Sequence, residues 1–175
     1  AEAEVLRSPL LIAKVADSLA LNVQIFRKGK LKNTLLHTDR IFDVEVISFV
    51  GEEDLKLVIQ VDDQRTFNIL DEEEQLVKKN VSFSKPFELN GNTLKFDPVK
   101  SEIEKGKSLK GTYLVKILTP QSVVSHITST LDVKALDKDL PILRIVYREE
   151  DPQLAKKVID ELCEIYIQDY INSKT

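Results

Sequence analysis

The chain has 175 residues, of which 42% are hydrophobic and 31% are charged, and this is the composition of a globular protein. Its 29 acidic residues exceed its 25 basic residues, and the net charge of −4 argues against a nucleic-acid binder. The single cysteine excludes an intramolecular disulfide, and two histidines leave little for a zinc site. No apolar run approaches the ~18 residues of a membrane span. Because the chain contains no methionine, we expect it to be a segment of a longer protein.

The first predicted element is a helix that begins after Ser8. Ser8 suits the N-cap, and Pro9 suits the first helical turn, where its missing N–H is not needed. Apolar side chains then recur with helical spacing at Ile12, Val15 and Leu19. Residues 1–6 are a candidate extra helical turn. Residues 22–26 read as a strand, followed by a lysine-rich turn around Gly29.

From residue 42 to residue 118 the apolar pattern changes to a period of two, which predicts half-buried antiparallel strands. The alternating apolar residues are Phe42, Val44, Val46, Leu55, Leu57, Ile59, Val61, Phe67, Ile69, Val81 and Phe83. Residues 100–111 are polar, contain two glycines and are predicted to form a loop. Another strand follows at 113–117.

Residues 87–96 read as a β-hairpin, for which two turns compete. A turn at 90–91 places Phe87 opposite Leu94. A turn at 91–92 instead pairs Phe87 with Phe96, Leu89 with Leu94, and Glu88 with Lys95. We predict the second turn, because it matches apolar with apolar side chains and opposite charges across the strands.

A second helix is predicted to begin at Pro120, with Thr119 as its cap. One apolar face of this helix consists of Val123, Ile127 and Leu131. The charged stretch 132–139 is predicted to be a loop. An apolar strand is expected at 142–147.

The last predicted helix begins at Asp151 and Pro152 and extends to about residue 172. Its apolar residues are Leu154, Val158, Ile159, Leu162, Ile165, Tyr166 and Tyr170. The order of elements predicts an α+β fold, with a mixed or antiparallel sheet, helices packed on one face and a long C-terminal helix. We predict a single domain over 1–175, with a β-rich insertion at about 41–111.

The acidic clusters of the sequence do not form a recognisable site. The run 71–74 (DEEE) lacks the alternating ligands and glycine of a calcium loop, so we predict a solvated turn. The pairs at 62–63 and 149–150 resemble the paired carboxylates of glycosidases, but 29 acidic residues produce such pairs by chance.

We predict structural roles for the histidines, the cysteine and a basic cluster as well. His37 and His126 lack partners in a known catalytic arrangement, and Cys163 is predicted to be a small packed residue. A basic cluster, defined as Arg27, Lys28, Lys30 and Lys32, is an alternative contact for anionic lipid or polysaccharide, although a solvated turn is the preferred interpretation. Motifs for nucleotide binding, zinc hydrolysis and a nucleophile elbow are missing. The sequence therefore predicts no catalytic, cofactor-binding or metal-ligating residue.

Three stretches, in this order, resemble the periplasmic domain of the polysaccharide co-polymerases, the chain-length determinant family. They are the opening helix at 1–23, the β-rich middle from 46 through 57–77 to 90–96, and the strand and helix at 122–175. The middle is most similar to the exopolysaccharide tyrosine autokinase branch. At the end, Asp151, Pro152 and Ala155 match the family's DP..A pattern, and Tyr166 falls near its terminal tyrosine. Glu161 stands where the pattern has asparagine, which departs from the family.

This resemblance implies a non-enzymatic periplasmic portion of a bacterial inner-membrane protein involved in chain-length control and export of capsular or exopolysaccharide. It further implies homo-oligomers of the full-length protein, anchoring by flanking transmembrane helices, and contact with the polymerase and export machinery. No nucleic-acid partner and no cofactor are expected. The parent protein of this branch can carry a cytoplasmic tyrosine kinase. The alternative is an extracytoplasmic ligand-binding or sensor module, which requires a concave pocket with converging polar groups.

Overall fold

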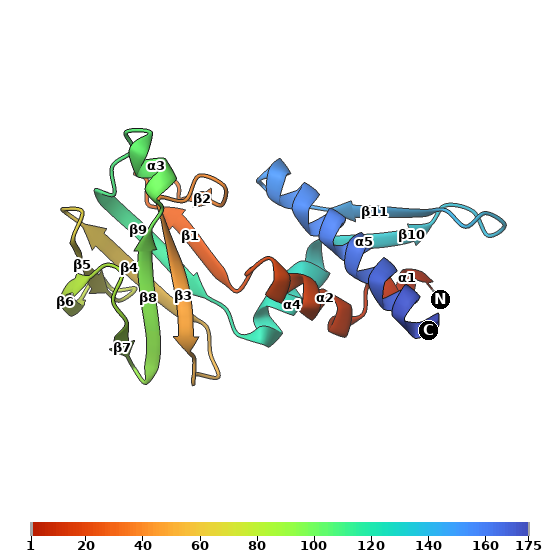
Figure 1. Cartoon of the computed structure of the whole chain (residues 1–175), viewed down its shortest axis with the longest axis horizontal. Helices are drawn as coiled ribbons and strands as arrows, with labels where there is room; N and C mark the ends of the chain where they lie inside the picture. The colour runs from red at the N-terminus through yellow and green to blue at the C-terminus, as the bar shows by residue number, and fades with distance from the viewer. Residues whose placement is uncertain (1, 175) are drawn as a thin grey trace. The chain divides into compact units, whose positions relative to one another are not determined.

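The computed structural model describes residues 2–174 and has the predicted α+β fold, with antiparallel strand pairs (Figure 1). It divides into two compact units. Unit 1 comprises the described parts of residues 1–22 and 120–175, and unit 2 comprises residues 23–119. The β-rich part is therefore larger than the predicted insertion at about 41–111 and forms a compact unit of its own. The reason is that the strands at 23–27 and 111–117 pair with each other and extend the same sheet.

Within its described residues, unit 1 contains four helices and one two-stranded antiparallel sheet. These elements are α1 (Glu2–Leu6), α2 (Pro9–Ser18), α4 (Pro120–Thr130), β10 (Leu131–Ala135), β11 (Leu143–Tyr147) and α5 (Pro152–Lys174). Helix α5 packs against α2 and against β11 (Figure 1). Each of these elements contributes to the buried core, which contains Leu6, Leu11, Ile12, Val15, Ala16, Val123, Ile127, Leu131, Val133, Tyr147, Leu154, Val158 and Leu162.

Two helix starts in unit 1 confirm the predictions from the sequence. The Leu11 N–H donates to the Ser8 hydroxyl oxygen at 3.2 Å, which caps α2. At α5, the Gln153 N–H donates to the Asp151 carboxylate at 2.9 Å, and Pro152 is the first helical residue.

The predicted loop over 132–139 is wrong for its first residues, which belong to β10. Leu131 and Val133 are buried and pair with β11, so Leu131 belongs to the strand and not to the preceding helix. Asp132 and Lys134 project to the other face, where their side chains lie 3.4 Å apart. The charged residues that indicated a loop thus lie on the exposed face of a strand, in which buried and exposed side chains alternate.

Unit 2 is built from nine strands and a short helix, all among the described residues. They are β1 (Val23–Arg27), β2 (Thr34–Leu36), β3 (Phe42–Ser48), β4 (Leu55–Val61), β5 (Thr66–Leu70), β6 (Leu76–Ser82), β7 (Phe87–Leu89), β8 (Asn92–Pro98), α3 (Lys100–Glu104) and β9 (Gly111–Ile117). A six-stranded sheet has the order β2-β1-β9-β4-β5-β6, and a three-stranded sheet has the order β3-β8-β7. Both sheets contribute side chains to one hydrophobic core.

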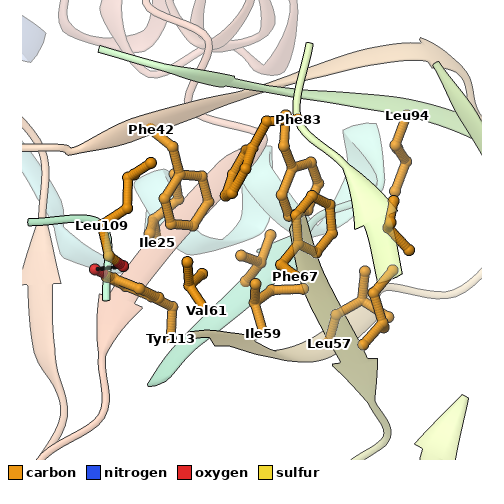
Figure 2. Close-up of a cluster of buried hydrophobic side chains, with 14 of the residues drawn as sticks. Ile25, Phe42, Leu57, Ile59, Val61, Phe67, Phe83, Leu94, Leu109 and Tyr113 are labelled. Atoms are coloured by element: carbon orange, nitrogen blue, oxygen red, sulfur yellow. Dashed lines mark hydrogen bonds between the residues drawn. The ribbon is translucent and has the colours of Figure 1, made fainter. Parts of the chain in front are cut away.

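Aromatic rings occupy the centre of this core (Figure 2). The Phe96 ring stacks on Phe42 and Phe67, with centroids 5.5 and 4.9 Å apart. Tyr113 approaches Phe42 edge-on at 5.0 Å, and its hydroxyl donates to the Leu109 carbonyl at 2.8 Å, which Figure 2 shows as a dashed line. The buried hydroxyl therefore has a hydrogen-bond partner, as a buried polar atom requires.

The hairpin prediction is wrong in its turn, because the chain reverses at 90–91. Both Asn90 and Gly91 have positive φ, 52° and 81°, which suits the two-residue turn that matches strand twist. Phe87 therefore pairs with Leu94. The apolar and charge matches that favoured the other register are satisfied elsewhere, because β8 also pairs with β3. On that side Phe96 lies opposite Val44 and Lys95 lies opposite Glu45.

The predicted loop over 100–111 contains the short helix α3, which the sequence did not indicate. Glu102 in α3 and Leu109 after it are buried. Lys105 and Lys107 place their ammonium groups 3.0 and 2.5 Å from the Glu102 carboxylate. These two lysines lower the pKa of Glu102, so the carboxylate stays ionised and ties the following loop to the helix.

Candidate functional site

The candidate site lies on the face of the six-stranded sheet that points away from the hydrophobic core. Leu57, Ile59 and Tyr113 fill the core side of β4 and β9. Their neighbours Val58 and Thr112 project to the opposite face, since successive strand residues alternate. An open depression of about 300 Å³ is found there. We call it the sheet-face depression, and its lining residues are Lys28, Gly29, Lys30, Val58, Gln60, Leu70, Glu74 and Thr112.

The floor of the sheet-face depression comes from three neighbouring strands. Val58 on β4 pairs with Leu70 on β5, and both are buried although they lie outside the main core. Gln60 on β4 pairs with Thr112 on β9 and adds an amide and a hydroxyl beside this apolar pair. The floor thus combines an aliphatic surface with side-chain donors and acceptors.

Two loops form the rim. Lys28 and Lys30 follow the end of β1, and Glu74 lies in the turn between β5 and β6. The Lys28 ammonium is 3.3 Å from the Glu74 carboxylate, so an ion pair bridges the two sides of the rim. Gly29 is required here, because a Cβ atom would lie only 2.5 Å from the carbonyl oxygen of Lys32.

The basic cluster divides between the two sides of the sheet. Lys28 and Lys30 line the sheet-face depression, whereas Lys32 is exposed outside it. The Arg27 guanidinium lies 5.2 Å from the centroid of the Tyr113 ring, at the core side. The interpretation as a simple solvated turn therefore describes only part of the cluster.

The acidic candidates are turn-forming residues. The Asp71 carboxylate accepts the N–H groups of Glu73 and Gln75 at 2.9 and 2.8 Å, which confirms the predicted turn at 71–74. The Asp63 carboxylate accepts the N–H groups of Thr66 and Arg65, and these bonds lower its pKa.

The remaining acidic pair, Glu149 and Glu150, lies just before α5. The Glu149 carboxylate accepts the N–H of Glu150 at 2.9 Å. Both side chains belong to unit 1, whereas the pair at 62–63 belongs to unit 2. One carboxylate of each acidic pair, Asp63 or Glu149, is therefore hydrogen-bonded to its own local backbone.

The histidines and the cysteine lie in separate places. His37 follows β2, and its backbone N–H donates to the Asp39 carboxylate at 3.1 Å. His126 is exposed on α4. Cys163 lies on α5, where burial, followed by the charge of Asp160, raises the pKa of its thiol. A raised pKa disfavours the thiolate, the nucleophilic form of cysteine.

The residues of the DP..A pattern form the start of α5. Asp151 caps the helix through its carboxylate, and its carbonyl accepts the N–H of Ala155 at 3.0 Å. Farther along, the Ser18 hydroxyl donates to the Glu161 carboxylate at 2.7 Å. Tyr166 is partly exposed, and burial is the first cause that raises its pKa. These residues therefore build and position the helix.

The residues at the floor of the sheet-face depression were not predicted from the sequence, although the sequence contains one indication of them. In these strands apolar core residues should alternate with polar outer residues. Val58 and Leu70 break this pattern, because each is apolar although it follows a core residue directly. An apolar residue on the outer face of a half-exposed sheet indicates that something covers that point. Gln60 and Thr112 carry no such signal, since polar residues are expected on that face.

Two kinds of feature are absent from residues 2–174. No group of three or more His, Cys, Asp or Glu side chains in this range is arranged to hold a metal ion. None of the helices in the same range is long and apolar enough to cross a membrane. No protein-family model matches the chain, and no curated protein shows significant similarity to it.

Proposed function

We propose that the chain is a non-enzymatic periplasmic domain of a bacterial inner-membrane polysaccharide co-polymerase. In this role it takes part in chain-length control and export of capsular or exopolysaccharide. The full-length protein would act as a homo-oligomer anchored by flanking transmembrane helices. Because the chain is most similar to the autokinase branch, we also propose that the full-length protein can carry a cytoplasmic tyrosine kinase.

One observation carries this proposal: the stretches that bear the resemblance separate into the two units. The opening and closing stretches, almost 100 residues apart in the chain, assemble unit 1, and the β-rich middle stretch forms unit 2. Helices from the two ends are held together by Lys14, whose ammonium lies 2.8 Å from the Asp169 carboxylate, and by the bond from Ser18 to Glu161. Two chain ends that pack together, with a compact unit between them in the sequence, are what an inserted branch-specific segment predicts.

The C-terminal part of α5 supports an assembly role. Ile167, Tyr170 and Ile171 are each about half exposed, at 52%, 53% and 50%. Their spacing of three and four residues places them on one side of the helix. Such an apolar stripe is suited to contact with a neighbouring subunit, so that packing outside the membrane can be transmitted to the rest of the protein.

The test is to delete the gene and to measure the length of the exported polysaccharide by gel electrophoresis. We expect an altered length distribution, restored by the wild-type gene. Tyr170→Glu should fail to restore it, while Gln168→Glu, which adds the same charge elsewhere on α5, should succeed. An unchanged polysaccharide after deletion would contradict the proposal.

The sheet-face depression favours the alternative of an extracytoplasmic ligand-binding or sensor module. It is concave and brings polar groups together, as such a module requires. Normal polysaccharide in the deletion strain, together with binding of a small solute by the purified chain, would make this the preferred function.

A further inference from the structure

We propose that the sheet-face depression binds an acidic saccharide unit, with a uronic-acid carboxylate held by Lys28 and Lys30. The inference rests on the proposed function, because that function brings the chain into contact with polysaccharide. It adds a specific site in unit 2, whereas the proposed assembly surface lies in unit 1.

The shape and lining of the depression fit a sugar ring. A pyranose has an apolar C–H face and a hydroxyl-bearing edge. Val58 and Leu70 lie at the floor of the depression, where they are 5% and 8% exposed, and Gln60 and Thr112 supply donors and acceptors for the hydroxyl-bearing edge. The volume of about 300 Å³ lies at the lower end of the usual range for ligand pockets, which suits one or two sugar residues.

The two lysines of the lining favour an anion, although the β5–β6 loop of the rim is itself acidic through Asp71, Glu72 and Glu73. Two lysines face one glutamate, Glu74, so the lining carries a net charge of 2 − 1 = +1, against a chain total of −4. Lys30 is in no ion pair with the described residues and is available to a ligand carboxylate. Charge-assisted hydrogen bonds of this kind are stronger than neutral ones.

Lys28 is already paired, but its partner can be displaced. The Glu74 side chain is 70% exposed, and the ammonium–carboxylate distance is 3.3 Å. Exposed pairs of this type add little stability, because solvent screens them. A ligand carboxylate that also contacts Lys30 therefore competes with Glu74 for Lys28.

The experiment is calorimetric titration of the chain with trigalacturonic acid, with maltotriose as the neutral probe. We expect binding of the acidic trisaccharide and much weaker binding of maltotriose. Lys30→Ala should lower the affinity about tenfold, because it removes one charged hydrogen-bond donor. Lys32→Ala removes the same charge from the same loop outside the depression, and it should leave the affinity unchanged.

A second variant tests the competition directly and acts in the opposite direction. Glu74→Gln removes the competing carboxylate, so it should raise the affinity for trigalacturonic acid. Absence of binding, equal affinity for maltotriose, equal losses in Lys30→Ala and Lys32→Ala, or no gain in Glu74→Gln would each overturn the proposal.

The outcome can be separated from that of the proposed function. If the deletion strain shows altered polysaccharide but the chain does not bind trigalacturonic acid, only the site is rejected. If the chain binds with the expected pattern but deletion leaves the polysaccharide unchanged, the site stands and the proposed function is rejected.

Discussion

Tyr113 shows how a single polar atom is accommodated inside the aromatic core of unit 2. Its side chain is fully buried, and its hydroxyl donates to the Leu109 carbonyl at 2.8 Å. We expect Tyr113→Phe to lower the free energy of unfolding by about 1–2 kcal/mol, because the buried carbonyl loses its donor. Urea denaturation measures this loss. Tyr170→Phe removes the same hydroxyl from an exposed site and should change stability by less than ~0.5 kcal/mol.

Tyr147 predicts how stability depends on alkaline pH. Burial, then the nearby Glu149 charge, raises its pKa to about 12 from an ordinary value of 10.0, and a hydrogen bond from Thr130 acts in the opposite direction. Between pH 10 and pH 12 the unfolded chain loses the phenolic proton while the folded chain retains it. Stability conferred by the raised pKa is therefore complete below pH 10 and decreases as the pH rises to 12.

The measurement is urea denaturation of wild type and Tyr147→Phe across this range. The wild type should lose up to about 1.4 kcal/mol more per pH unit than the variant, since one pKa unit corresponds to that energy. Parallel curves for the two proteins would show that Tyr147 does not cause the alkaline loss.

At the scale of elements, α5 combines a buried stripe with an exposed continuation. Leu162 is 1% exposed in the core of unit 1, whereas Glu164 two residues later is exposed. We expect Leu162→Ala to cost ~2–5 kcal/mol, because it removes buried methyl groups and leaves a cavity. Glu164→Ala should stay within ~0.5 kcal/mol.

Tyr170→Ala distinguishes the two halves of the same helix. Since its side chain is 53% exposed, this variant should destabilise the chain much less than Leu162→Ala does. Thermal denaturation of the three variants gives the comparison. Equal effects of Leu162→Ala and Tyr170→Ala would mean that the helix is anchored along its whole length.

The elements that the sequence predicts well are those whose signals are local. Helix α5 has a cap, a first-turn proline and an apolar stripe, so both its start and its length could be predicted. The register of the hairpin could not be predicted, because β8 pairs with both β3 and β7 and pattern matching within the hairpin considers only β7. Strand β10 was not predicted, because the charged residues on its exposed face made the short segment look like a loop.

The sheet-face depression was only partly predictable for a related reason. Lys28 and Lys30 stand out in the sequence as a basic cluster, and their proximity to each other is local. Their encounter with Glu74 and Val58 depends on the strand order β1-β9-β4-β5, which brings together residues about 30 to 45 positions apart. Periodicity within one strand contains no information about that order.

At the scale of the whole molecule, unit 2 is continuous in sequence and unit 1 is not. Residues 23–119 form one compact unit with its own core. We therefore expect a fragment of residues 23–119 to fold alone, with β-rich circular dichroism and cooperative urea unfolding. Residues 120–175 alone lack α2 and should not fold, because α5 packs against that helix. A disordered 23–119 fragment would contradict this division.

The pairing of β1 with β9 also has a mechanical consequence. The chain enters unit 2 at Val23 and leaves it just after Ile117, and these two residues lie opposite each other in the antiparallel pair. Tension applied at the two ends of this unit would pull directly across their hydrogen bonds. Because the bonds of an antiparallel pair lie perpendicular to the strands, they would open one after another, as in a zip, and not break together in shear. Unit 2 would therefore yield at low force and lengthen the chain, while each bond could re-form in reverse order when the force is released.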